Sequence, residues 1–180
     1  MQLSKLLGLI EFKNLDFSYT NDKNFIFRNL NFELAAQHLN VIKGNNGSGK
    51  TTLAKPFAEL IGGIHINADV VRTSYDDWDF SPEGRIRQAQ RMRHLADGVV
   101  MAGIIAVADF VCPTEKARAE FNPDYSVWMD TIDEGRFEDT NKMFVPPEHV
   151  DYKVSKWFDD THVQLVEVVS SYMKRNDGKS

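Results

Sequence analysis

The chain has 180 residues, of which 42% are hydrophobic and 26% charged, so its length suits one α/β domain and excludes a second full domain. The formal net charge of -5 comes from interspersed acidic and basic residues, which excludes a chain-wide attraction to nucleic acid or to anionic lipid. A single cysteine, Cys112, excludes an internal disulfide framework, and no apolar stretch suits a signal peptide or membrane span, so we expect a cytoplasmic protein.

The first third of the chain contains two strand-like segments and then a strand, a loop and a helix. Leu9 to Tyr19 and Phe25 to Leu34 alternate apolar and polar residues on either side of a turn-like segment, which predicts an antiparallel strand pair. The apolar run from Leu39 to Ile42 predicts a short buried strand, and Lys50 to Leu60 has a helical pattern. A glycine-rich loop joins the last two.

Strands and helices continue to alternate after residue 60. Strands are expected at 64–66, 104–108, 125–129 and 150–154, helices at 81–101, 114–121 and 161–173, and a loop or lid at 138–150. Ser81, Pro82 and Glu83 form a typical helix start. This alternation predicts a parallel sheet with helices on both faces, and we expect one domain of residues 1–180, with a core of 38–175 and an added strand segment of 1–37.

The loop between the first buried strand and its helix has the pattern of a phosphate-binding loop. It reads Gly44, Asn45, Asn46, Gly47, Ser48, Gly49, Lys50 and Thr51, followed by Thr52, and it fits G-x-x-x-x-G-K-[ST]. In that pattern backbone N–H groups surround phosphate oxygens, the lysine reaches the β- and γ-phosphates, and the hydroxyl of Thr51 ligates magnesium. The sequence therefore predicts an α/β P-loop NTPase fold that binds ATP and Mg²⁺, with a chance glycine turn as the alternative.

Two acidic residues compete for the role of the reacting or metal-holding carboxylate. Asp69 lies just past the second parallel strand, with Arg72 three residues further on, and Asp109 follows the apolar run 104–108. A carboxylate at the carboxyl edge of such a sheet could accept a proton from an attacking hydroxyl or hold magnesium, while Arg72 could pair with an anionic substrate. The alternatives are a capping Asp69 with a solvated Arg72, and an ordinary loop acid at Asp109.

Other polar residues carry weaker signals. The long predicted helix has four arginines and few acids, so it is either a positive face for an anionic substrate or a solvated face: Arg85, Arg87, Arg91 and Arg93. His65 and His94 have no partner at metal-ligand spacing, and Cys112 precedes a proline, so we expect all three to be structural.

Residues from about Leu9 to Thr52 resemble the start of an ABC transporter ATPase. The resemblance rests on the segment from Ile10 to Tyr19, on the strand pair, and on the Asn-Asn-Gly-Ser-Gly-Lys-Thr-Thr form of the loop. It implies that Tyr19 stacks on adenine. After Thr52 the chain has no Ser-Gly-Gly-Gln signature, glutamine loop or switch histidine, which disfavours a truncated ABC subunit.

From about Thr51 onward the chain resembles the adenylylsulfate kinase family. The family's Asp-Gly-Asp-x-x-Arg corresponds to residues 67–72, where Asn67 replaces the first acid, and its Gly-Phe-Ser turn corresponds to 79–81. Its strand ending in Phe-Ile-Ser-Pro corresponds to 110–113, with Asp109 and Cys112 in place of Ala and Ser. The match over residues 69–113 has no gap.

This resemblance implies roles for individual residues. Asp69 would be the base or the magnesium partner, Lys50 would neutralise charge, and Arg72 and Arg85 would hold a phosphate or sulfate group. Phe80 would stack on a substrate adenine, and two further positions are expected to contact substrate: Gln88, which stands where the family has Asn, and Val111.

The two resemblances meet at the shared loop and predict a chimera-like chain. We expect an ATP- and magnesium-dependent phosphotransferase acting on a small-molecule hydroxyl, with adenylyl sulfate as the leading acceptor. The alternative is a non-catalytic or weakly hydrolytic ATP-binding chimera in which the loop is misplaced relative to Asp69. No nucleic acid partner or membrane insertion is expected, and homodimerisation is left open.

Overall fold

The computed structural model describes residues 9–17, 27–35, 39–44, 47–133, 135, 138–156, 158 and 160–176. Its elements, in chain order, are β1 (Leu9–Phe17), β2 (Phe27–Ala35), β3 (Leu39–Gly44), α1 (Lys50–Leu60), β4 (Ile64–Asn67), α2 (Ala68–Tyr75), α3 (Pro82–Met101), β5 (Ala106–Phe110), α4 (Glu115–Phe121), β6 (Tyr125–Met129), α5 (Glu138–Met143), β7 (Tyr152–Val154) and α6 (Thr161–Asn176). No helix of these described ranges is long and apolar enough to span a membrane.

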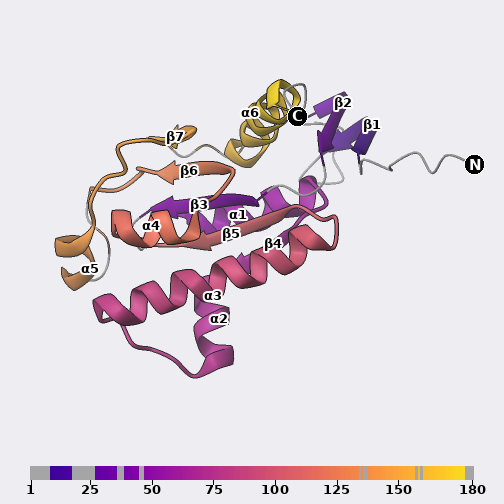
Figure 1. Cartoon of the computed structure of the whole chain (residues 1–180). Helices are drawn as coiled ribbons and strands as arrows, with labels where there is room; N and C mark the ends of the chain where they lie inside the picture. Colours follow the sequence, from indigo (N-terminus) through magenta and orange to yellow (C-terminus); the bar gives the residue numbers. More distant parts are fainter. Residues whose placement is uncertain are drawn as a thin grey trace, which may run out of the picture.

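The strands form two separate sheets (Figure 1). Five parallel strands have the order β4-β5-β3-β6-β7, so the strand that leads into the phosphate loop lies at the centre. β1 and β2 pair antiparallel outside that sheet. The parallel sheet and the antiparallel pair confirm the sequence predictions. β3 suits its central place because Ile42 and Val41 are buried in the two separate core clusters of the molecule.

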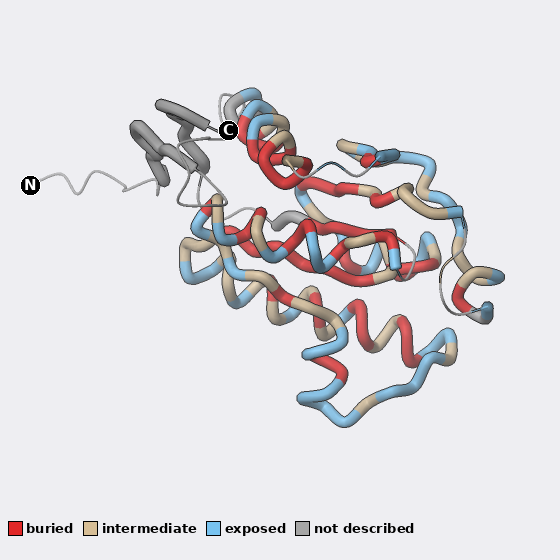
Figure 2. Tube along the Cα trace, turned by 180° about the vertical axis from the view of Figure 1, so that it is seen from behind, coloured by how far each residue is buried: buried red, intermediate tan, exposed pale blue. Residues whose placement is uncertain are grey.

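Helices cover both faces of the five-stranded sheet, which gives three layers. α1 and α6 pack on one face around Phe57, Leu53 and Leu165, and α3 packs on the other through Met92 and Ala96. Figure 2 shows that the red, buried positions follow the central strands and the inward sides of these helices. The doubly covered sheet confirms the predicted α/β P-loop fold class.

Three local features differ from the sequence prediction. The strand predicted at 104–108 begins at Ala106 and ends at Phe110, so Asp109 lies inside a fully buried strand and not in a loop. The segment 138–150 contains the short helix α5. The unpredicted helix α2 starts directly after β4, because the Asn67 side chain caps it by accepting hydrogen bonds from the backbone N–H groups of Asp69 and Val70.

Candidate active site

The phosphate-binding loop and the start of α1 form an anion-binding geometry. Gly49, with φ of 86°, precedes the helix and supplies no side-chain cap, and backbone N–H groups at a helix start bind anions. A Cβ on Gly44 would lie 2.5 Å from the carbonyl oxygen of Met129, so only glycine allows this approach of β3 to β6. The hydroxyl of Ser48 is buried without a hydrogen-bond partner among the described residues.

One residue from outside the loop binds its backbone, while three residues predicted to contact nucleotide lie outside the described part of the chain. Thr131, after β6, donates a hydrogen bond of 2.8 Å to the backbone oxygen of Ser48. Lys50 is 8% exposed, and burial lowers the pKa of its amine while the charges of Asp109 and Asp69 oppose that shift. The remaining predicted nucleotide contacts lie outside the described residues: Tyr19, Asn45 and Asn46.

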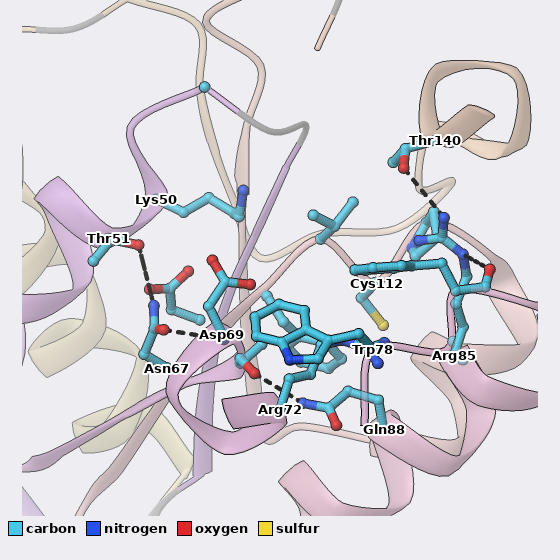
Figure 3. Close-up of a pocket in the computed structure, with 18 of the residues that line it drawn as sticks. Lys50, Thr51, Asn67, Asp69, Arg72, Trp78, Arg85, Gln88, Cys112 and Thr140 are labelled. Atoms are coloured by element: carbon cyan, nitrogen blue, oxygen red, sulfur yellow. Dashed lines mark hydrogen bonds between the residues drawn. The ribbon is translucent and has the colours of Figure 1, made fainter. Parts of the chain in front are cut away.

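A cavity of about 910 Å³ opens beside this loop, at the carboxyl ends of β3, β4 and β5. Ligands of open α/β sheets bind at this edge. Figure 3 shows Lys50, Thr51 and Asp69 on one side of the cavity and Arg85 and Thr140 on the opposite side. The residues that the sequence predicts to bind the substrate or the magnesium ion all line this cavity: Thr51, Asp69, Arg72, Phe80, Arg85, Gln88 and Val111.

The two competing carboxylates both line the cavity but have different surroundings. Asp109 is 2% exposed and accepts hydrogen bonds from Thr51, Asn67 and His65. Burial alone would raise the pKa of Asp109, but these hydrogen bonds and the charge of Lys50 hold it below its ordinary value. The carboxylate is therefore charged at neutral pH.

Asp69, by contrast, is exposed in the first turn of α2. Its backbone N–H donates to Asn67, and its carboxylate accepts no hydrogen bond from a described residue. The residue that caps α2 is therefore Asn67, and the alternative of a capping Asp69 is wrong. Because the Asp69 carboxylate faces the cavity beside Lys50 (Figure 3), it can accept a proton from a bound hydroxyl.

A turn between α2 and α3 forms an aromatic wall of the cavity. Trp78 and Phe80 are about half exposed, with ring centroids 6.4 Å apart. The guanidinium of Arg72 lies 4.6 Å from the Phe80 ring centroid and donates hydrogen bonds to the backbone oxygens of Asp77 and Asp79. Arg72 therefore fixes the turn as well as lining the cavity, and burial lowers the pKa of its guanidinium.

Arg85 connects this turn to the segment predicted as a loop or lid. Its Nε donates to the backbone oxygen of Phe80 at 2.9 Å, and its Nη2 donates to the hydroxyl of Thr140 in α5 at 3.2 Å. Gln88, one turn further along α3, is 2% exposed and donates to the backbone oxygen of Ala68 at 3.0 Å. These contacts join α2, α3 and α5 on the side of the cavity away from Lys50 (Figure 3).

The other arginines of α3 do not face the cavity as free positive charges. Arg87 and Arg91 both form ion pairs with Asp77, at 2.8 and 2.7 Å, and Arg93 pairs with Asp97 at 2.8 Å. Of the four helix arginines, Arg85 alone lines the cavity. The acids of the preceding turn pair with Arg87 and Arg91, which does not favour the alternative of a positive helix face.

Four residues of this site were not predicted from the sequence. Asn67 and His65 bind Asp109, Trp78 lies beside Phe80, and Thr140 binds Arg85. The exposed Trp78 next to the predicted substrate residue Phe80 was a usable signal, as was the Asn67-Ala68-Asp69 helix start. The contacts of His65 and Thr140 depend on residues 44 and 55 positions away, so no local pattern marks them.

The fold and the loop define a P-loop nucleotide-binding protein of the kinase type. The family model described as "Adenylylsulphate kinase" matches residues 38–128, which is half of the chain. The chain belongs to the adenylylsulphate kinase family.

The chain also matches ATP-binding proteins of transporters, which confirms its resemblance to ABC transporter ATPases. It is 49% identical over 53 residues to the energy-coupling factor transporter ATP-binding protein EcfA1 of Fusobacterium nucleatum, covering 29% of this chain and 19% of that protein. It is 43% identical over 53 residues to the alpha-hemolysin translocation ATP-binding protein HlyB of Escherichia coli O157:H7, covering 29% and 8%. The chain thus spans less than a fifth of the length of either relative.

Solved structures with the same fold include kinases. The Mycobacterium tuberculosis APS kinase CysC, solved in complex with AMPPNP and APS, superposes with a TM-score of 0.63 at 16% identity, covering 74% of this chain and 98% of that one. A gluconokinase from Sinorhizobium meliloti superposes with a TM-score of 0.59 at 11% identity, covering 80% and 98%. At these identities the likeness establishes the fold alone.

Proposed function

We propose that this protein is an ATP- and magnesium-dependent phosphotransferase that transfers the γ-phosphoryl group to a hydroxyl of a small anionic acceptor, with adenylyl sulfate as the leading candidate. The observation that supports this most is the composition of one cavity. It combines the phosphate loop, the exposed carboxylate of Asp69, and a wall of arginine and aromatic side chains.

The nucleotide side of the proposal uses the residues of the loop. Backbone N–H groups from Gly44 to Thr52 would hold the phosphates, and Lys50 would neutralise charge that develops on the transferred group. The oxygen donors Thr51 and Asp69 fit a hard cation, and Mg²⁺ bound there would neutralise phosphate charge. Among the described residues no group of three or more His, Cys, Asp or Glu side chains could hold a metal alone, so phosphate oxygens would complete the coordination. Tyr19 would stack on adenine.

The acceptor side of the proposal uses the opposite wall. Arg72 and Arg85 both lie over the Phe80 ring, with distances of 4.6 and 5.5 Å from guanidinium carbon to ring centroid. An acceptor with a planar base and an anionic group can stack on Phe80 and pair with these guanidinium groups. Gln88 and Val111 line the same wall and would contact the acceptor. Asp69 would take the proton of the acceptor hydroxyl as the hydroxyl oxygen bonds to the γ-phosphorus, while the bond from that phosphorus to the β–γ bridging oxygen breaks and ADP leaves.

An acceptor screen tests this function. The protein is incubated with Mg-ATP and, separately, with adenylyl sulfate, nucleosides and sugars, and products are identified by mass spectrometry beside ADP. We expect the wild-type protein to form equal amounts of a phosphorylated acceptor and ADP. The Lys50→Ala variant should form no phosphorylated acceptor. ATP binding with no phosphorylated product from any acceptor would favour the non-catalytic alternative.

A further inference from the structure

The short helix α5 is connected to α3 by a buried side chain. Among the described side chains of α5, Thr140 alone is buried, with 4% of its surface exposed. Its hydroxyl accepts a hydrogen bond of 3.2 Å from Nη2 of Arg85. Glu138 and Lys142 of the same helix are exposed and pair with each other at 2.7 Å. A hydroxyl group therefore joins α5 to the arginine and aromatic wall of the cavity (Figure 3).

The guanidinium group of Arg85 is held at two points. Its Nε donates to the backbone oxygen of Phe80 at 2.9 Å, and its Nη2 donates to Thr140. Arg85 is 7% exposed, and its guanidinium carbon lies 5.5 Å from the centroid of the Phe80 ring. Because a guanidinium is planar and rigid, two hydrogen bonds to fixed partners set the plane of the whole group. One partner belongs to the aromatic turn and the other belongs to α5.

The hydroxyl of Thr140 has the chemistry of a group that directs an arginine toward an anion. Thr140, Arg85 and Phe80 all line the cavity. A guanidinium has five N–H donors, so a hydrogen bond to Thr140 is compatible with an anion bound to the same group. A hydroxyl orients a guanidinium without pairing with its charge, whereas the carboxylate of Asp77 forms an ion pair with Arg87.

We propose that Thr140 is a positioning residue of the acceptor site: its hydroxyl sets the guanidinium of Arg85 for the anionic group of the acceptor, and it thereby couples acceptor binding to the docking of α5. The inference rests on the proposed function, in which Arg85 pairs with an anionic acceptor. Coupling between two sites is reciprocal, so if docked α5 raises the affinity for the acceptor, a bound acceptor stabilises docked α5 by the same factor. A purely structural Thr140 would hold α5 in place and leave acceptor affinity unchanged.

Steady-state kinetics of Thr140→Val test the positioning role. Valine has nearly the shape of threonine but lacks the hydroxyl, so the change removes the hydrogen bond and little else. We expect the KM for adenylyl sulfate to rise roughly 5- to 150-fold, the usual range of coupling between two sites. The KM for ATP and kcat should stay near their wild-type values, because an interaction made equally in the ground and transition states affects KM alone. Thr140→Ser keeps the hydroxyl and should keep the wild-type KM.

Thr161→Val is the matched control. Thr161 is 3% exposed, and its hydroxyl makes two hydrogen bonds with the backbone of Phe158 at the start of α6. Neither of these residues lines the cavity. Both valine variants should lower thermal stability, because each leaves a polar group without its partner, but only Thr140→Val should change the KM for adenylyl sulfate. If Thr140→Val does not fold, Thr140→Ser and Thr140→Ala, which differ by one hydroxyl, give the same comparison.

Hydrogen exchange followed by mass spectrometry tests the coupling without turnover. The full chain is held in Mg-ADP, and the exchange of peptides that cover α5 is compared with and without saturating adenylyl sulfate. We expect adenylyl sulfate to slow the exchange of these peptides in the wild type and in Thr140→Ser. In Thr140→Val their exchange should be the same with and without adenylyl sulfate.

The outcomes separate the inference from the proposed function. A wild type that neither binds nor phosphorylates adenylyl sulfate would contradict the proposed acceptor and the inference with it. An active wild type with an unchanged KM in Thr140→Val would overturn the inference alone, and so would a KM that rises equally in Thr140→Ser. If the KM rises in Thr140→Val but adenylyl sulfate does not slow the exchange of α5 in the wild type, the coupling to α5 is overturned.

Discussion

Two glycines of α3 offer a matched test of the turn that carries Trp78 and Phe80. Gly98 is exposed, and a Cβ added there meets nothing within 4 Å. Gly84 is buried in the first turn, and a Cβ added there would lie 2.4 Å from the backbone oxygen of Asp79. The same substitution, Gly to Ala in one helix, therefore meets open space at one position and the backbone of the turn at the other.

The expected magnitudes follow from this geometry. Gly98→Ala should stabilise the protein by roughly 0.5–1 kcal/mol, the usual gain in helix propensity. At Gly84 the same gain is opposed, because non-bonded atoms settle at about 3.5 Å, so Asp79 must move by about 1 Å. Overpacking of this kind costs about 1–3 kcal/mol, and that is the predicted difference in unfolding free energy between the two variants. The shift also strains the 3.1 Å hydrogen bond from Arg72 to Asp79.

Urea unfolding and steady-state kinetics check this prediction together. Gly84→Ala should lose acceptor efficiency by on the order of 10²-fold, because a displacement of about 1 Å at a positioned group has that effect. Its ATP affinity should stay at the wild-type value, since the phosphate loop is not touched. If Gly84→Ala matched Gly98→Ala in both stability and acceptor KM, the turn would not belong to the acceptor site and the reasoning would be refuted.

Four further predictions concern single residues and the amino-terminal strands. Lys50→Ala should fold and bind ATP roughly 10- to 100-fold more weakly by calorimetry, since charged hydrogen bonds contribute about 1.5–3 kcal/mol; unchanged affinity would contradict the loop assignment. Asp69→Asn should lower kcat by about 10²–10⁴-fold and leave ATP affinity unchanged. Full activity of this variant in stopped assays would exclude Asp69 as the base. Burial raises the pKa of Cys112 to about 12, so little of its thiol is ionised at pH 8. Iodoacetamide should therefore label the folded protein slowly at pH 8 and faster as the pH rises, as followed by mass spectrometry. Rapid labelling at pH 8 would contradict a buried thiol. We also propose that residues 38–175 are the catalytic core, so removing residues 1–31 should lower thermal stability more than it weakens ATP binding, to which the removed segment would contribute only the stacking of Tyr19. Complete loss of ATP binding from a folded remainder would contradict this and make the amino-terminal strands an essential part of the nucleotide site.

The order of elements was predictable because local signals were strong. The apolar run of β3, the helix start at Ser81 and the helical pattern of residues 114–121 each mark an element whose bounds the structure reproduces closely. The phosphate loop was predictable for the same reason, since its pattern is contiguous. Such signals depend on residues within one turn or one strand, which a sequence displays directly.

The side-chain contacts of the site were not predictable, because they depend on register and on distant elements. Asp109 was expected after the end of a strand, as a metal-holding carboxylate or as a loop acid, but it lies inside β5, where the register of β4 and β5 pairs it with Asn67. The pairing of Arg87 with Asp77 depends on how the α2–α3 turn folds back onto α3. Charge counting along a helix cannot detect such neutralisation.

The most direct measurement of the central claim follows the γ-phosphoryl group itself. The protein is given ATP labelled with ³²P at the γ position, Mg²⁺ and adenylyl sulfate, and the products are separated by chromatography. We predict that the label appears on a hydroxyl of the acceptor, that ADP forms in equal amount, and that Lys50→Ala and EDTA each abolish the transfer. Label found only as inorganic phosphate, or retained in ATP under every condition, would contradict a phosphotransferase that acts on this acceptor.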